Sequence, residues 1–292
     1  MDRRFDMALL PTTYLDAVLA LGIYDDKGNP DWIASGFLYG DYIRPAEEGQ
    51  NLYRVYLVTN RHVLENKDKI CIRCNPIADE PAKTYTARLT DANGERLWFA
   101  SPRGDADVAV LSVNMPLLRK EGMKVSYFHS DGNVANAEKM KELGMAEGDS
   151  AYALGFPMKL VGEQRNVVIV RSGSIARIRD TISGSTTNFL VDAFVFPGNS
   201  GGPVVLKPES IAVGGAEPIR LAYLIGVVAG YVTYKDIAVS MQTKRPRVIF
   251  EENSGLTAVY PIDFVEQAVQ IAKRQDTEAT ISAGQEQDRP AQ

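Results

Sequence analysis

The feature that most constrains this chain is a serine inside a glycine-rich loop, with every histidine of the sequence lying before it. The loop reads Gly-Asn-Ser-Gly-Gly-Pro over residues 198–203, between two apolar runs, and the two histidines are His62 and His129. Glycines let backbone N–H groups converge on one point without crowding by side chains. Two converging N–H groups form an oxyanion hole, which stabilises the tetrahedral intermediate of acyl transfer. The loop therefore predicts Ser200 as a nucleophile.

The positions of the histidines decide between two folds that present such a serine. Residues 198–202 also match the G-x-S-x-G turn of α/β hydrolases, in which the catalytic residues follow the order serine, acid, histidine. No histidine follows Ser200, so that fold would lack its base. The order histidine, aspartate, serine remains, which is the chymotrypsin order.

His62 is the stronger candidate for the base that activates Ser200. An apolar run that ends at Val58 precedes it, so the end of a strand would present its side chain to a cleft. His129 lies in a segment that connects the two halves of the chain and has no comparable context. We therefore expect His129 to have no role in the chemistry.

The third residue of such a site is an acid that orients the histidine ring and stabilises its charged form. Asp107 precedes a buried apolar run over residues 108–111, and a carboxylate buried there without a partner would be costly. Asp105 is the competing candidate, but its surroundings indicate a solvated turn. We therefore predict Asp107 as the acid.

The rest of the chain is organised as short strands. Apolar or alternating runs separated by turn signals fill residues 14–115 and resume from residue 150, for example at 221–231 and 256–260, which is typical of an all-β barrel or sandwich. An amphipathic segment after Pro261 predicts a closing helix. The expected parts are an N-terminal extension (1–13), a first barrel (14–115), a crossing with a short helix at 134–143 (116–149), a second barrel with the closing helix (150–274) and a flexible tail (275–292).

Composition and hydropathy exclude several function classes. The chain carries 32 Lys and Arg against 37 Asp and Glu, a formal charge of −5, which gives no electrostatic reason to expect a nucleic-acid partner. The longest apolar run, residues 221–232, is shorter than the about 20 residues of a membrane helix. The N-terminus has no clean signal peptide. We therefore expect a cytoplasmic protein without a membrane partner.

Metal and redox chemistry have few candidate ligands. Cys71 and Cys74 are the only cysteines, and they lie three residues apart on a predicted strand, where they would face opposite sides. One such pair builds neither a disulfide framework nor a tetrahedral zinc site, and the two histidines lie far apart in the sequence. We expect no metal and no cofactor, and two ordinary core cysteines.

Taken together, these residues resemble the trypsin-like serine peptidases of the chymotrypsin fold, and more closely their bacterial HtrA-like branch. The resemblance covers the chain from residue 17 to about residue 272. The serine loop is specific by itself, and the other landmarks are specific in combination. They are residues 34–37 (ASGF), 58–63 (VTNRHV), 107–111 (DVAVL), 155–157 (GFP), 191–193 (VDA), 225–228 (IGVV) and 258–262 (AVYPI).

The resemblance implies a fold and a set of site residues. The fold would be two packed six-stranded antiparallel β-barrels with a C-terminal helix. The catalytic triad would lie in the cleft between the barrels, with His62 and Asp107 from the first barrel and Ser200 from the second. The oxyanion hole would consist of the backbone N–H groups of Gly198 and Ser200.

Two departures from the family pattern concern regulation. Asn199 stands where the digestive members have an aspartate that pairs with a new N-terminus after zymogen cleavage. Asparagine has no charge for that pair, so we expect control by loops or by a regulatory protein partner. HtrA-like proteins usually carry a peptide-binding PDZ domain after the protease, and with 20 residues after Ala272 we expect none here.

The expected activity is that of a serine endopeptidase that cleaves a protein or peptide substrate through a covalent acyl-enzyme. Phe194, six residues before the nucleophile, would line the primary pocket, and Tyr231 would narrow it. These side chains favour uncharged, apolar P1 residues, unless they are only part of the barrel core. Two alternatives stay open: a latent or non-catalytic binding module on a protease-like fold, and an esterase on the same barrels.

Overall fold

Hairpins of antiparallel strands build the first half of the chain, where β-branched and aromatic residues alternate with turns. The computed structural model describes residues 10–46, 51–209 and 218–287. The strands of the first half are β1 (Val18–Tyr24), β2 (Pro30–Pro45), β3 (Asn51–Thr59), β4 (Lys69–Cys74), β5 (Lys83–Arg88), β6 (Trp98–Ala100), β7 (Ala109–Ser112) and β8 (Phe128–His129).

These strands form one sheet with the order β5-β4-β1-β2-β3-β7-β6, and β8 adds to it by parallel pairing with β2. The two edges of the sheet approach each other just beyond β5. There Leu97 N donates to Leu89 O at 2.9 Å, and Thr90 forms a bridge with Arg96. The first sheet is therefore a barrel that strand pairing closes only at one corner.

The strands of the second half form a completely closed barrel. Its strand order is β10-β11-β14-β13-β12-β9. The predicted double β-barrel architecture with a C-terminal helix is confirmed, and the first barrel is the less regular of the two. The strands of the second barrel are β9 (Ser150–Gly155), β10 (Ile169–Arg177), β11 (Phe189–Asp192), β12 (Pro203–Leu206), β13 (Tyr223–Val239) and β14 (Pro246–Pro261).

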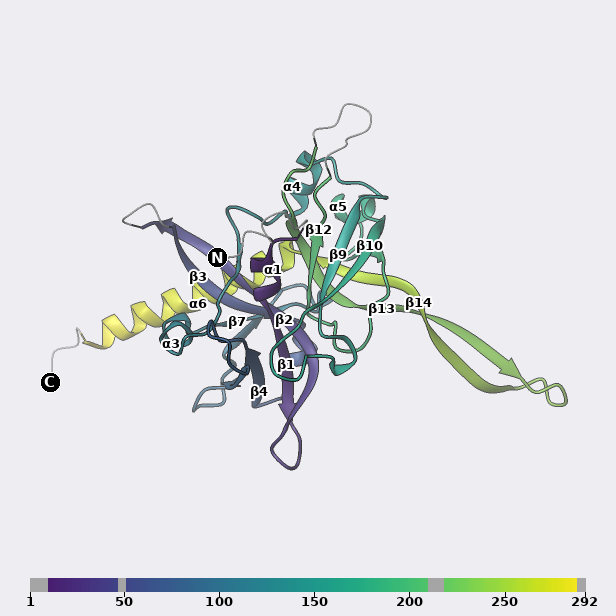
Figure 1. The fold of residues 1–292 in the computed structure, drawn as a ribbon, viewed down its shortest axis with the longest axis horizontal. Coiled ribbons are helices and arrows are strands. Elements are labelled where there is room, and N and C mark those ends of the chain that lie inside the picture. Colours follow the sequence, from purple (N-terminus) through teal and green to yellow (C-terminus); the bar gives the residue numbers. More distant parts are fainter. Residues whose placement is uncertain (1–9, 47–50, 210–217, 288–292) are drawn as a thin grey trace.

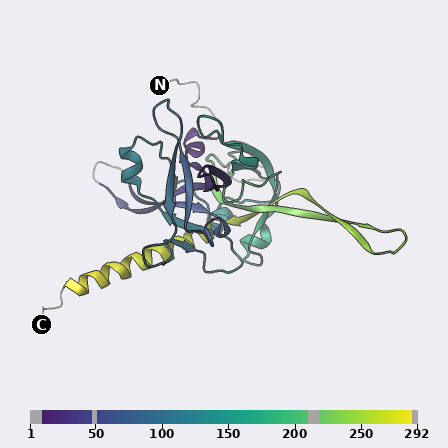
Figure 2. The ribbon, with the colours of Figure 1, turned by 90° about the horizontal axis from the view of Figure 1, so that it is seen from below.

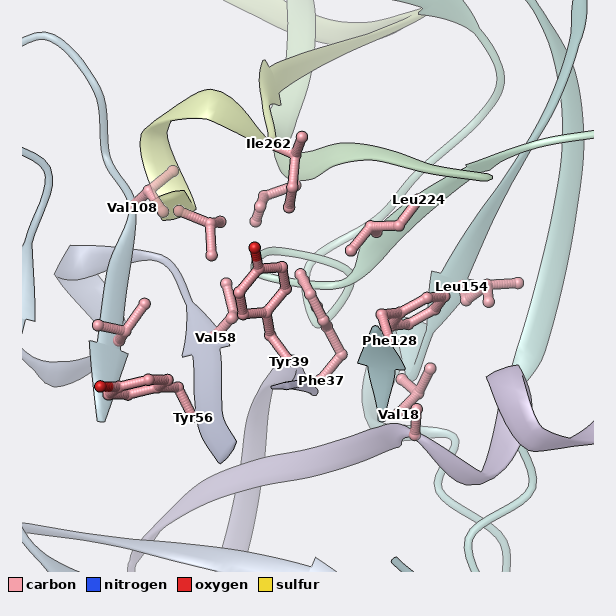
Figure 3. Close-up of a cluster of buried hydrophobic side chains, with 14 of the residues drawn as sticks. Val18, Phe37, Tyr39, Tyr56, Val58, Val108, Phe128, Leu154, Leu224 and Ile262 are labelled. Atoms are coloured by element: carbon pink, nitrogen blue, oxygen red, sulfur yellow. The ribbon is translucent and has the colours of Figure 1, made fainter. Parts of the chain in front are cut away.

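A shared apolar core joins the two barrels (Figure 3). The rings of Phe37 and Phe128 meet edge to face with centroids 5.7 Å apart, and Tyr39 belongs to the same cluster. The second barrel contributes Leu154 from β9 and Leu224 from β13 to this cluster. Burial of these side chains from both halves holds the barrels against each other, so loops of the two halves meet in a defined arrangement.

The helices are short except for the last. The crossing over 116–149 contains β8 and two helices rather than the single helix that the sequence predicted. The unexpected one begins after Asn114, whose side chain accepts a hydrogen bond from Leu117 N at 3.1 Å, an ordinary N-cap. The helices are α1 (Thr12–Asp16), α2 (Arg61–Leu64), α3 (Met115–Lys120), α4 (Ala137–Glu142), the 3-10 turn η3 (Pro157–Lys159), α5 (Arg179–Ile182) and α6 (Asp263–Gln287).

The C-terminal helix α6 is longer than expected. The sequence predicted a flexible tail from residue 275, whereas α6 continues to Gln287. Its last turns have no continuous apolar face, and they contain Ala, Glu and Gln, which favour helix, beside Thr, Ser and Gly, which do not. Residues 1–9 and 288–292, which belong to the predicted N-terminal extension and tail, lie outside the described residues. In the part of the chain that the structure describes, no helix has both the length and the apolar character of a membrane span.

Strands β13 and β14 are much longer than the runs at 221–231 and 256–260 predicted. They leave the second barrel together and continue as a two-stranded ribbon that projects from the body in both views (Figure 1, Figure 2). We call residues 233–253 the arm. Its sequence mixes charged with apolar residues and has no Asn-Gly or Asp-Gly turn, so the usual signals of a hairpin are absent.

Candidate active site

Strand pairing brings His62 and Asp107 together. In the ladder between β3 and β7, Thr59 pairs with Ala109. The chain turns into α2 after Thr59, which places His62 beside the residue that precedes β7. His62 Nδ1 lies 2.5 Å from Asp107 Oδ2, and His62 N donates to Asp107 Oδ1 at 3.0 Å. Both carboxylate oxygens therefore bind the same histidine, one through its ring and one through its backbone.

These contacts determine the tautomer of the His62 ring and the ionisation of Asp107. A carboxylate at Nδ1 favours the tautomer with the proton on that nitrogen, which leaves Nε2 as a proton acceptor. Burial alone would raise the pKa of Asp107, but the hydrogen bonds from the ring and backbone of His62 outweigh it and hold this pKa below its ordinary value. Asp107 is therefore ionised wherever the ring works as a base.

Asp105, the competing candidate for the acid, and His129, the competing candidate for the base, have other partners. Asp105 accepts two hydrogen bonds from Arg103, at 2.8 and 3.0 Å, and these bonds lower its pKa to about 2. His129 packs against the rings of Tyr127 and Tyr53, each with centroids 4.8 Å away. Burial lowers the pKa of the His129 ring.

The chain between β11 and β12 passes Phe194 and then forms the serine loop, residues 198–202. This loop docks on the first barrel. Ser35 N in β2 donates to Ser200 O at 3.0 Å. A Cβ atom at Gly201 would lie 2.2 Å from Thr59 Oγ1 and 3.0 Å from Thr59 Cα, so only glycine allows this approach. The serine loop therefore lies against Thr59, the end of the strand that leads to His62.

The hydroxyl of Ser200 does not bind the histidine ring. Ser200 Oγ donates to Ala229 O at 3.5 Å, and within the described residues no hydrogen bond joins Ser200 Oγ to His62. The pair of His62 and Asp107 is thus formed, while the hydroxyl is held at the neighbouring strand β13. A contact of 3.5 Å is weak, so little opposes the rotation of the hydroxyl away from Ala229.

The backbone around Gly198 has a conformation that only glycine readily adopts. Gly198 adopts φ +101°, and a Cβ atom there would lie 2.4 Å from Phe156 O. Pro197 O accepts from Met158 N at 2.7 Å, so this carbonyl is turned toward η3. Among the described residues neither Gly198 N nor Ser200 N has an acceptor. Both N–H groups are therefore available to a ligand.

Ser35 is a residue of this site whose role sequence reasoning missed. Its buried Oγ donates to Gly198 O at 2.7 Å and accepts from Phe156 N at 2.9 Å. It thus ties the carbonyl of Gly198 to the loop after β9. The only signal was its place in the ASGF landmark at residues 34–37, because partners more than 100 residues away cannot be read from the sequence.

Asn199 is completely buried in the same loop. Its Oδ1 accepts from Phe196 N at 3.1 Å, while its Nδ2 has no hydrogen-bond partner among the described residues. An aspartate at this position would bring a charge into the same buried place. The neutral amide fits the sequence-based expectation of control without a zymogen ion pair, which stays a prediction.

The two predicted pocket residues lie on an open surface. Phe194 is 52% exposed, and its ring covers Gly255 of β14, where a Cβ atom would lie 3.2 Å away. Tyr231 is 38% exposed and pairs with Thr257 of β14. Neither side chain belongs to the barrel core, so both are accessible from solvent.

Metal ligands are scarce in the described part of the chain, where no three His, Cys, Asp or Glu side chains gather closely enough to hold a metal ion. Cys71 and Cys74 are free and buried. Burial raises the pKa of Cys71 to about 11 and that of Cys74 to about 12. Thiols with such values are poor nucleophiles at neutral pH.

The chain is similar to known proteins at the level of a family model and of a solved structure. A family model described as a trypsin-like peptidase domain matches residues 34–214. The fold is similar to a crystal structure of the Rv3671c protease in an inactive form, with 15% sequence identity, a TM-score of 0.44, and coverage of 93% of this chain and 96% of that chain. No curated protein matches the sequence.

Proposed function

The chain belongs to the trypsin-like peptidase family, and on that premise we propose that it is a serine endopeptidase whose triad is His62, Asp107 and Ser200. The observation that carries this proposal is the double hydrogen bond between Asp107 and His62, at 2.5 and 3.0 Å. It leaves Nε2 of the ring as the base beside a glycine-rich serine loop. The free N–H groups of Gly198 and Ser200 support the same conclusion.

In the acylation step, Ser200 Oγ leaves Ala229 O and attacks the carbonyl carbon of the scissile peptide bond. His62 Nε2 takes the hydroxyl proton as the Oγ–C bond forms. The N–H groups of Gly198 and Ser200 donate to the oxyanion, and Asp107 stabilises the charged ring. His62 then gives the proton to the departing amine, the C–N bond breaks, and an ester on Ser200 remains.

Deacylation repeats these roles with water. His62 Nε2 takes a proton from the water molecule that attacks the ester carbonyl, and the same N–H groups bind the second oxyanion. Return of the proton to Ser200 Oγ breaks the Oγ–C bond and releases the carboxylic acid. Acylation and deacylation therefore need no reactant besides the peptide substrate, water and groups of this chain.

A fluorophosphonate label tests the proposal without knowledge of the substrate. The label reacts with a serine only when its base and oxyanion donors are assembled. We expect the wild-type protein to be labelled, Ser200→Ala to be unlabelled and His62→Ala to lose nearly all labelling. His129→Ala is the matched control and should label like wild type. Equal loss in the two histidine variants would overturn the choice of His62 as the base.

The proposed P1 preference is for uncharged apolar side chains. Phe194, six residues before Ser200, and Tyr231, two residues after the Ala229 that Ser200 contacts, present apolar surface, and neither carries a charge that would bind Lys or Arg. Hydrolysis of a peptide library with varied P1 residues measures this preference. Cleavage mainly after Lys or Arg would contradict it.

A second candidate, a latent protease-like binding module, is favoured by one observation. Ser200 Oγ binds Ala229 O rather than the ring of His62. If that arrangement persisted in solution, wild-type protein would resist the fluorophosphonate while still binding peptides. Labelling of the wild type at a rate that depends on His62 would exclude this alternative.

A further inference from the structure

The arm, residues 233–253, is a part of the molecule that the catalytic site does not explain. Its ladder consists of seven residue pairs, from Thr233 with Asn253 to Val239 with Pro246, and every residue of these pairs except the half-buried Asn253 is exposed. Figures 1 and 2 show it extending away from both barrels, with no other element beside it. An isolated two-stranded hairpin is at best marginally stable in water, so such a ribbon normally packs on something.

Both faces of the arm carry apolar side chains. On one face Ile237 pairs with Ile249, and these side chains are 50% and 60% exposed. On the other face lie Val248 and Phe250, each 49% exposed. Apolar residues in one continuous ribbon, rather than scattered over a surface, indicate an interaction site.

The outer edge of β14 in the arm is also open. β14 pairs with β11 only over residues 256–259, so residues 247–252 have β13 on one side and no described strand on the other. An open edge presents unpaired backbone N–H and C=O groups, which are a template for another strand. Pro246 has no N–H group and therefore ends the usable edge on the side of the tip.

The residues on this edge are complementary to themselves. Consider two copies of β14 that run antiparallel across a two-fold axis at Ile249. In that register Ile249 lies opposite Ile249 of the second copy, Val248 lies opposite Phe250, and Arg247 lies opposite Glu251. If the axis lay at Phe250 instead, Val248 would lie opposite Glu252. If it lay at Val248, Arg247 would lie opposite Ile249. Only the centred register therefore joins apolar to apolar and cation to anion.

The charges of the arm fit the same pairing. Arg247 has no ion pair within the described residues, while Glu251 binds Lys235 of its own arm at 2.6 Å. In the paired form each Glu251 would receive a second cation, so one carboxylate would link two copies. Opposite charges directly across a pair of strands stabilise antiparallel pairing.

We propose that the protein forms a two-fold dimer in which the β14 edges of two arms pair over residues 247–251 into a four-stranded antiparallel sheet. Such an isologous contact uses one surface on both copies and closes after two molecules. The apolar pair Val248 and Phe250 then occurs twice on one face of the shared sheet. This proposal does not depend on the proposed peptidase activity.

The first test measures the dimerisation constant by analytical ultracentrifugation of the whole chain, in a Ser200→Ala background that prevents self-cleavage. Arg247→Glu places like charges opposite each other twice in the dimer and should weaken association about tenfold or more. Arg245→Glu makes the same change of charge outside the paired segment and should have a much smaller effect. A protein that is monomeric up to high micromolar concentration, or a dimer equally sensitive to both changes, would overturn the proposal.

A second test locates the axis. Ile249→Cys puts two thiols directly opposite each other, where cross-strand Cβ atoms are about 5 Å apart. A short bis-maleimide should therefore cross-link this variant into covalent dimers. Ile237→Cys, on the same face but on β13, should stay largely uncrosslinked, and the natural cysteines are buried. Equal cross-linking of the two variants, or of neither, would exclude the β14 edge as the contact.

Discussion

Replacing Ser35 with alanine tests whether the serine loop is positioned from the first barrel. The change removes one oxygen atom that is completely buried. That atom donates to Gly198 O at 2.7 Å and accepts from Phe156 N at 2.9 Å. Alanine fits the same space, so the variant keeps the fold while leaving both backbone groups without a partner.

The expected loss of activity is large for a residue that does not touch the substrate. A buried polar group left unpaired costs about 1–3 kcal/mol. Relief of that cost lets the Gly198 carbonyl, which belongs to the Gly198–Asn199 peptide, reorient, and the accompanying change of backbone dihedrals at Gly198 displaces the adjoining N–H of Gly198 from the oxyanion. Loss of one oxyanion donor slows acyl transfer roughly 10²–10³-fold. Because the N–H of Ser200 stays and reorientation is partial, we expect kcat to fall about 10- to 100-fold.

The assay is the second-order rate of fluorophosphonate labelling, with ester hydrolysis giving kcat and KM separately. A positioning role lowers kcat and leaves KM nearly unchanged, since the N–H groups act mainly in the transition state. Ser130→Ala is the matched control, because its Oγ accepts from the backbone N of Tyr42 at 2.9 Å in the first barrel. Thermal unfolding of both variants measures the purely structural effect.

Three results would refute this reasoning. Labelling at the wild-type rate by a folded Ser35→Ala protein would show that the loop holds its shape without Ser35. Equal losses of activity in the Ser35 and Ser130 variants would indicate general destabilisation. A rise in KM with unchanged kcat would place Ser35 in substrate binding instead.

Two other predictions concern ionisable groups. Asp107→Asn keeps the shape of the acid but favours the wrong tautomer of His62, so kcat should fall by roughly 10⁴-fold with the fold intact; a loss below tenfold in ester hydrolysis would contradict the assigned role. Burial, together with the carboxylates of Asp263 and Asp41, raises the pKa of Glu266, so its ionisation destabilises the folded chain as the pH rises from the ordinary glutamate pKa through the raised one. Glu266→Gln should therefore raise the Tm at neutral pH and lose this advantage in acid; a gain that is independent of pH would exclude the ionisation as its cause.

Several features were predictable because they depend on local pattern. The strands of the two barrels follow from short runs of apolar residues, and α6 follows from the apolar period after Pro261. The N-cap at Asn114 was readable in the same way but was overlooked. The length of α6 was underestimated because its last turns have no apolar face, and the arm was missed because its apolar residues are not arranged for burial in the barrel.

The sequence by itself determined the order of the candidate triad. A chain with two histidines, both before Ser200, excludes the α/β-hydrolase arrangement, and the strand contexts single out His62 and Asp107. The structure brings these two side chains into hydrogen-bond contact, while their catalytic roles stay predictions. Such choices need only residue types and their order along the chain.

The tertiary structure alone decided how the site is held and what surrounds it. The bonds of Ser35 to Gly198 and Phe156, the contact of Ser200 with Ala229, and the exposure of Phe194 all join or separate segments far apart in the sequence. Residue types specify which hydrogen bonds and burials are possible. Only the packing of the two barrels selects which of them form, because each contact requires backbone positions set by the whole fold.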